Sequence, residues 1–258
     1  MFWGKTTGAA KRELHIPSYA THEWLEKRIS SVEADFYRLL QTASDLLTRS
    51  CIYFTPMNLI HIGEPGDTRT QQDEFDELVR SALLHLDGVP RYGERLAHIR
   101  AASSDLQAAL GAAQISAQLA RLLRERKATP FMLAPLRRVG DPALRALENA
   151  AHAAQSRNPT HAQAGLQAWH EARDAGEEVG AMFPAFAAFL PADTCRLIRA
   201  ALTALDVTAE SAARIAIHCG EAPSLTPPRL APITGVPRRT WSKEEQLAPL
   251  PSIMPRKR

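Results

Sequence analysis

Hydrophobic residues recur at alternating spacings of four and three between residues 22 and 49. The positions in this pattern are Leu25, Ile29, Val32, Phe36, Leu39, Ala43 and Leu46. This spacing places the apolar side chains on one face of an α-helix and forms a heptad seam. We expect a helix in the core of a bundle. A coiled-coil dimer seam is the alternative, because about three heptads is the shortest length that suggests one.

Helical periodicity continues along most of the chain as far as residue 220. The further helices are expected at about 70–87, 92–127, 141–154, 158–182, 193–205 and 208–219. Gly111 either bends the long helix or separates two helices. The pairs Asp141-Pro142 and Asn158-Pro159 each combine an N-cap residue with proline at the first helical position, which is a helix start signal. A tight turn at Asp206-Val207-Thr208 separates the last two helices.

The segment 52–62 alone has the character of a β-strand. Its apolar run is interrupted near Pro56–Asn58, which suits either a short β-hairpin or a buried extended connection. All the other periodic segments are helical. The sequence therefore predicts an all-α fold, a multi-helix bundle of about seven or eight helices with short connections.

The amino-acid composition changes along the chain. Residues 1–100 hold 7 alanines, whereas residues 101–220 hold 33, and the aromatic residues concentrate in the first part. We expect an aromatic-containing N-terminal helical part and an Ala-rich, closely packed helical part that together form one continuous domain. Residues 221–258 contain eight prolines and little apolar periodicity, which predicts a disordered tail.

The formal net charge is only +3, and most of it lies in the tail, where seven Lys/Arg face three Glu. The N-terminus lacks the apolar segment of a secretory signal, and the apolar runs are too short to cross a bilayer. With three widely spaced cysteines, these features predict reduced thiols, a cytoplasmic location and no membrane contact. The Ala- and Arg-rich composition is typical of GC-rich bacterial genomes.

Sequence motifs of enzymes are absent. The chain has no phosphate-binding Gly-Lys-Ser/Thr loop, dinucleotide fingerprint, nucleophile elbow or Cys-x-x-Cys. Acid–histidine pairs occur at Glu94/His98, Glu148/His152 and His170/Asp174, but none has the Glu-x-x-His spacing of a di-metal bundle. We therefore expect no metal, no cofactor and no catalytic residues, although a catalytic site assembled from distant residues would leave no such motif.

Basic residues cluster once inside the helical region and again in the tail. The candidate nucleic-acid-binding residues are Arg121, Arg124, Arg126, Lys127, Arg137, Arg138, Arg238 and Arg239. Guanidinium groups suit backbone phosphates, so these residues predict sequence-independent contacts. The alternative is that the cations at 121–127 complement the negative end of a helix dipole.

Taken together, these patterns favour a non-enzymatic helical interaction or adaptor protein, a subunit of a larger assembly that contains protein and can include nucleic acid. A helical DNA-binding regulator is an alternative, using the two terminal helices as a helix-turn-helix together with the basic tail. An enzyme whose site is not local in the sequence is another. The sequence leaves the partner and the oligomeric state open.

Overall fold

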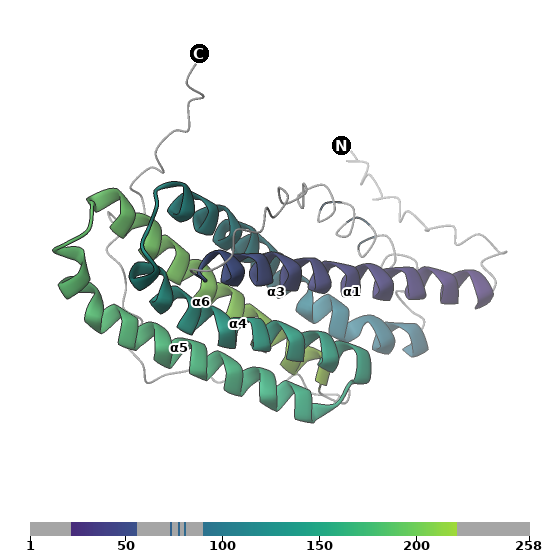
Figure 1. Ribbon diagram of the computed structural model, residues 1–258. Coiled ribbons are helices and arrows are strands. Elements are labelled where there is room, and N and C mark those ends of the chain that lie inside the picture. Colours follow the sequence, from purple (N-terminus) through teal and green to yellow (C-terminus); the bar gives the residue numbers. More distant parts are fainter. Residues whose placement is uncertain (1–21, 56–72, 74–76, 78–79, 81–89, 221–258) are drawn as a thin grey trace, which may run out of the picture. The chain divides into compact units, whose positions relative to one another are not determined.

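A computed structural model describes residues 22–55, 73, 77, 80 and 90–220 of the chain (Figure 1). Its helices are α1 (His22–Tyr53), α3 (Pro90–Glu125), α4 (Pro130–Ser156), α5 (Pro159–Ala187) and α6 (Ala192–Gly220). No strand occurs within these residues. The prediction of an all-α bundle is confirmed.

Four of the helices enclose the main core. α1 packs on α3 and α4, and α6 packs on the same two helices from the other side, so that the four form a closed group. α5 lies across α4 and α6. The Tyr53 ring at the end of α1 lies 5.2 Å from the guanidinium carbon of Arg124 near the end of α3, so these two helices run in the same direction. From these helix contacts, α4 and α6 each pack against three neighbouring helices.

The heptad seam of α1 lies in this core, as predicted. Ile29 and Phe36 are fully buried, and Leu39 is 1% exposed. The neighbouring Tyr37 donates a hydrogen bond of 2.8 Å from its hydroxyl to the carbonyl oxygen of Ala154 on α4. Because the seam packs against helices of the same chain, it is a bundle core and not an open coiled-coil surface.

The start of α4 was predicted wrongly. The signal at Asp141 and Pro142 lies in the middle of the helix, which begins instead at Pro130 and contains both Pro135 and Pro142. Each interior proline removes one backbone hydrogen bond. The apolar period continues through them, and Leu133 and Leu136 are at most 5% exposed, so burial outweighs the lost bonds.

The predicted seven or eight helices are not supported by the described residues either. The predicted turn at 206–208 does not exist, because α6 is continuous from Ala192 to Gly220. Thr208 is fully buried there and donates its hydroxyl to the carbonyl oxygen of Ala204 at 2.8 Å, which satisfies the polar group inside the helix. α3 likewise continues through Gly111. The helix-turn-helix reading therefore loses its structural basis.

The predicted β-hairpin at 52–62 is not supported either. Ile52 and Tyr53 belong to α1, and Phe54 continues from it with a backbone hydrogen bond of 3.0 Å to the carbonyl oxygen of Ser50. Residues 56–62 lie outside the described part of the chain. Most of the expected helix at 70–87 and the whole tail 221–258 also lie outside it. None of the described helices has an apolar stretch long enough to cross a membrane.

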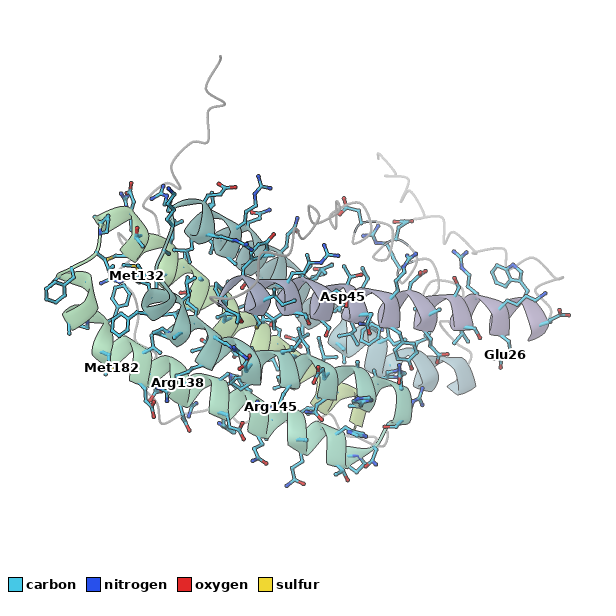
Figure 2. All side chains as sticks on the ribbon, in the orientation of Figure 1. Glu26, Asp45, Met132, Arg138, Arg145 and Met182 are labelled. Atoms are coloured by element: carbon cyan, nitrogen blue, oxygen red, sulfur yellow. The ribbon has the colours of Figure 1, made fainter. Side chains whose placement is uncertain are left out.

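The Ala-rich helices approach one another closely, as the composition suggested. A Cβ placed on Gly165 of α5 would lie 3.0 Å from the Cβ of Ala216 on α6. Along α4, Arg138 and Arg145 form ion pairs with Glu178 and Glu171 of the antiparallel α5. Figure 2 shows both arginines on the side of α4 that borders α5. The same Cβ on Gly165 would lie 3.5 Å from the Cβ of Asn149 on α4, so α5 also lies close to α4, and the two exposed ion pairs join these helices.

Candidate functional site

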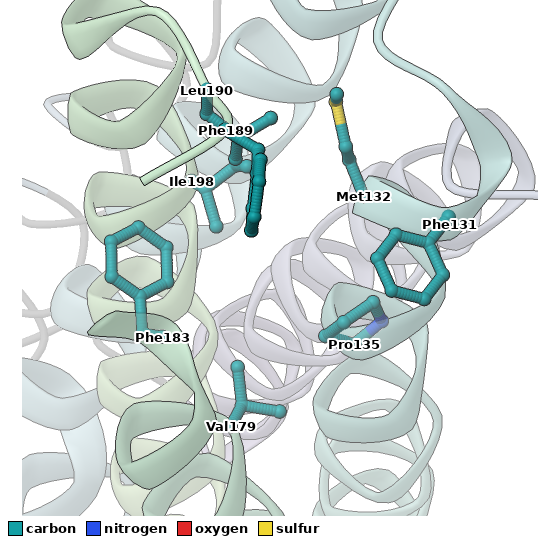
Figure 3. A pocket seen from close by; sticks show the side chains of 8 residues that line it. All are labelled: Phe131, Met132, Pro135, Val179, Phe183, Phe189, Leu190 and Ile198. Atoms are coloured by element: carbon teal, nitrogen blue, oxygen red, sulfur yellow. The ribbon is translucent and has the colours of Figure 1, made fainter. Parts of the chain in front are cut away.

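An apolar pocket of about 190 Å³ lies where the first turns of α4 meet the end of α5 and the start of α6. The residues that line it are Phe131, Met132, Pro135, Val179, Phe183, Phe189, Leu190 and Ile198. Figure 3 shows Phe131 and Pro135 facing Phe183 across the opening, with Phe189 between them. The lining carries no charged or polar side chain, so the pocket can take only an apolar group.

The pocket has a buried floor and an exposed rim. Val179, Phe183 and Ile198 are between 1% and 6% exposed, whereas Phe131 is 68% exposed and Phe189 is 88% exposed. Single exposed apolar residues are common on proteins, but a group of them around a concave surface marks an interaction site. This rim is therefore the strongest candidate for a functional surface among the described residues.

Phe131 is exposed because it lies in the first turn of α4. Thr129 is extended, with φ −72° and ψ 155°, and Pro130 takes the first helical position. The fixed φ of proline suits this position, where its missing N–H would be unpaired in any case. Phe131 follows in the first turn, where the helix itself provides little cover, and its ring stays largely in solvent.

The opposite wall of the pocket is formed by the last turns of α5, which contain residues that lower helix stability. Pro184 lies inside this helix and cannot donate to the carbonyl of Gly180. A Cβ on Gly176 or Gly180 would meet nothing within 4 Å, so close packing does not explain either glycine. Each glycine costs about 1 kcal/mol of helix stability relative to alanine. The helix ends at Ala187, and the short link to α6 carries Phe189.

Several cations lie on the segments that border the pocket. The carboxylate of Asp193 is shared by two arginines: Arg126, at 3.6 Å, and Arg196, one turn along α6. The guanidinium of Arg199 lies 4.8 Å from the centroid of the Phe183 ring, a cation–π contact against the pocket wall. Lys127, two residues after the end of α3, has a left-handed conformation with φ 54°. Two cations on one carboxylate leave an excess positive charge beside the pocket.

The predicted nucleic-acid-binding residues at the end of α3 face several neighbours. The Nε of Arg121 lies 2.9 Å from a carboxylate oxygen of Glu125, and Arg124 contacts the Tyr53 ring of α1. Arg126 turns toward α6, where it meets Asp193. These side chains therefore point in different directions and do not form one row of free cations.

The predicted residues on α4 are similarly paired. Arg137 lies 3.4 Å from Asp141 on the same helix, and Arg138 lies 2.6 Å from Glu178 on α5. Both residues were expected to follow a short Pro-containing link, and they lie within α4, which begins at Pro130. Arg238 and Arg239 lie outside the described residues. The carboxylates compete with phosphate for the guanidinium groups, so nucleic-acid binding through this set stays a prediction.

The described residues offer little for metal or nucleophilic chemistry. They contain no group of three or more His, Cys, Asp or Glu side chains placed to hold a metal ion. Burial raises the pKa of the Cys51 thiol to about 12, with the charge of Asp141 adding to the effect. Burial likewise raises the pKa of Cys219 to about 12. Both thiols are protonated at neutral pH and are not nucleophiles there.

Comparisons of the chain with protein-family models, curated proteins and solved structures find no match. The functional reading therefore rests on the pocket and its surroundings. Sequence reasoning missed this pocket because Phe131 and Phe189 fall in stretches that were expected to be links between helices. The available signal was a large aromatic residue close to proline in each of those stretches: Phe131 follows Pro130, and Phe189 lies two residues before Pro191.

Proposed function

We propose that the protein is a helical interaction protein, an adaptor that binds a segment of a partner protein in the pocket between α4, α5 and α6. The observation that carries the proposal is the pair of exposed rings, Phe131 and Phe189, at the mouth of an apolar pocket. Interface hot spots are typically aromatic residues beside desolvated pockets, with charged residues around them. The cytoplasmic location expected from the sequence belongs to this proposal.

Photo-crosslinking in the native host tests it. Phe189 is replaced by a photoreactive phenylalanine analogue, which its exposure should tolerate. The control carries the same analogue at Ile115, which is 50% exposed on α3 and does not line the pocket. A second variant, Val179→Trp, fills the pocket from its buried wall, and its melting temperature shows whether the bundle stays folded.

We expect one discrete protein adduct from position 189 that is absent from position 115 and lost in the Val179→Trp background. An adduct that survives filling of the pocket would show that the pocket is not the binding site. The same adduct from both positions would indicate non-specific contact. The absence of any adduct from position 189 would contradict the proposal.

Contact with nucleic acid is the second part of the sequence-based hypothesis and needs a separate test. If Arg126 and Lys127 contact phosphates, binding to random DNA and RNA should weaken steeply with salt. Replacing both residues with Gln should then reduce the log–log slope by about two units, one for each phosphate contact. A full-length protein that shows no salt-sensitive binding near 50 mM salt, where such contacts are strong, would end this branch.

A further inference from the structure

We infer that the occupant of the pocket is a single apolar side chain, Phe or Leu, presented by an acidic segment of the partner protein. This inference rests on the proposed function and adds the chemistry of the partner. Three observations carry it: the size of the pocket, the charge around its rim, and the charge of the other segments that might occupy it.

Size limits the occupant to one side chain. The pocket volume is about 190 Å³. An apolar cavity of about 150 Å³ holds one benzene molecule, whereas pockets for drug-sized ligands occupy about 300–1,000 Å³. A phenyl ring or a branched aliphatic group therefore fits, and a long acyl chain or a nucleobase with its sugar does not.

The charge around the pocket mouth indicates which residues of the partner flank the anchor. Asp193 is shared by Arg126 and Arg196, which leaves this group with one excess positive charge. None of the ion pairs within the described residues involves Lys127 or Arg199. Arg199 follows the lining residue Ile198 on α6, and Lys127 lies four residues before the lining residue Phe131, between α3 and α4. Carboxylates flanking the anchor would meet them as it enters.

The same charge disfavours two other occupants. In a symmetric dimer that places the two pockets against each other, the cations around one pocket would face those around the other. The C-terminal tail, 221–258, carries seven Lys/Arg against three Glu and would bring more positive charge to the rim. The rim therefore complements an acidic segment, and we assign that segment to a different protein. The acidic stretch 73–77 of this chain carries a phenylalanine as well, so the crosslinking test must distinguish the two.

Peptide binding followed by methyl NMR of the full-length protein tests the inference. The probe is a twelve-residue peptide with one Phe among Glu and Ala residues. Matched peptides carry Ala for the Phe, Gln for every Glu, or Lys for every Glu. The reporters are the methyl groups of Met132 and Ile198, which line the pocket, and the control is the methyl group of Ile115 on α3.

We expect the acidic peptide to shift the Met132 and Ile198 resonances and to leave Ile115 unchanged. The peptide without Phe should cause no shift. The Gln peptide should bind several-fold more weakly, and the Lys peptide at least tenfold more weakly. Arg199→Gln should weaken binding of the acidic peptide by up to about fivefold, as expected for one exposed ion pair, and leave the Gln peptide unaffected.

Three outcomes would overturn the inference. Equal affinities for the Glu and Gln peptides would remove the charge requirement, while the pocket would still bind an apolar anchor. A basic peptide or an oligonucleotide that shifts the same methyl groups more strongly than the acidic peptide would reverse the partner's charge or its class. If no peptide shifts these resonances, the partner chemistry is wrong, and the crosslink from Phe189 decides separately whether the proposed function survives.

An intramolecular crosslink from Phe189 to residues 56–89 would also overturn the inference, because the occupant would then belong to this chain. Mass spectrometry of the crosslinked protein distinguishes this product from an adduct with a second protein.

Discussion

Replacing Phe36 with alanine should be among the most damaging single changes to the bundle. Phe36 is fully buried on the face of α1 that packs against α3 and α4. Truncation of a buried phenylalanine removes its apolar contacts and leaves a cavity, and such changes cost about 3–5 kcal/mol. Domains are typically stable by about 5–15 kcal/mol, so the variant should still fold, with a much smaller margin.

Urea denaturation followed by circular dichroism measures this change. The midpoint should fall while the slope with urea stays constant, which would show that stability changed and not the compactness of either state. For a chain of this size, a loss of about 3–5 kcal/mol corresponds to a fall in melting temperature of roughly 6–20 °C.

The matched control is Phe189→Ala, since this ring is 88% exposed and its loss should change stability by no more than about 0.5 kcal/mol. If Phe36→Ala costs less than about 1 kcal/mol, or no more than the control, the α1 seam is not part of the core and the packing described above is wrong.

Other changes test separate features of the fold. Gly111→Ala should stabilise the protein by up to about 1 kcal/mol, because a Cβ there meets nothing within 4 Å. Gly165→Ala should gain less than this, because its Cβ would lie 3.0 Å from the Cβ of Ala216 on α6 and one of the helices must give way. Equal gains in melting temperature would refute the close α5–α6 contact. Cys51 and Cys219, with pKa values raised to about 12, should react slowly with a maleimide at pH 8 in the native protein and quickly in urea. Rapid native labelling would contradict their burial. Deleting 221–258 should leave the melting temperature almost unchanged, and a large fall would show that the tail packs on the bundle.

The parts of the fold that could be predicted are those fixed by local pattern. The heptad seam of α1 required only the spacing of its own apolar residues. The start of α5 required only Asn158 and Pro159: the helix begins at Pro159, and the side-chain oxygen of Asn158 accepts a hydrogen bond of 2.9 Å from the backbone N–H of Thr160. Such capping depends on neighbours in sequence and can be read without knowledge of the fold.

The errors arose where packing against distant helices outweighed local preference. Asp206, Val207 and Thr208 are weak helix formers, each by no more than about 0.7 kcal/mol relative to alanine. The flanking Leu205 and Ala209 are fully buried in the bundle, and their burial favours one continuous helix. The pocket was missed for the same reason, since its walls come from three helices and a link that no sequence window contains together.

The place of α6 in the chain affects how the protein is made. α6 is the last of the described helices in the sequence, yet α3, α4 and α5 all pack on it. Some 95 residues separate the end of α3 from the end of α6. At a synthesis rate of about 5–20 residues per second, α3 waits about 5–20 s on the ribosome before its partner helix is complete. Apolar helix faces thus remain uncovered in the nascent chain during that interval, which makes this stage of synthesis the most exposed to aggregation and the one at which a chaperone would be of most use.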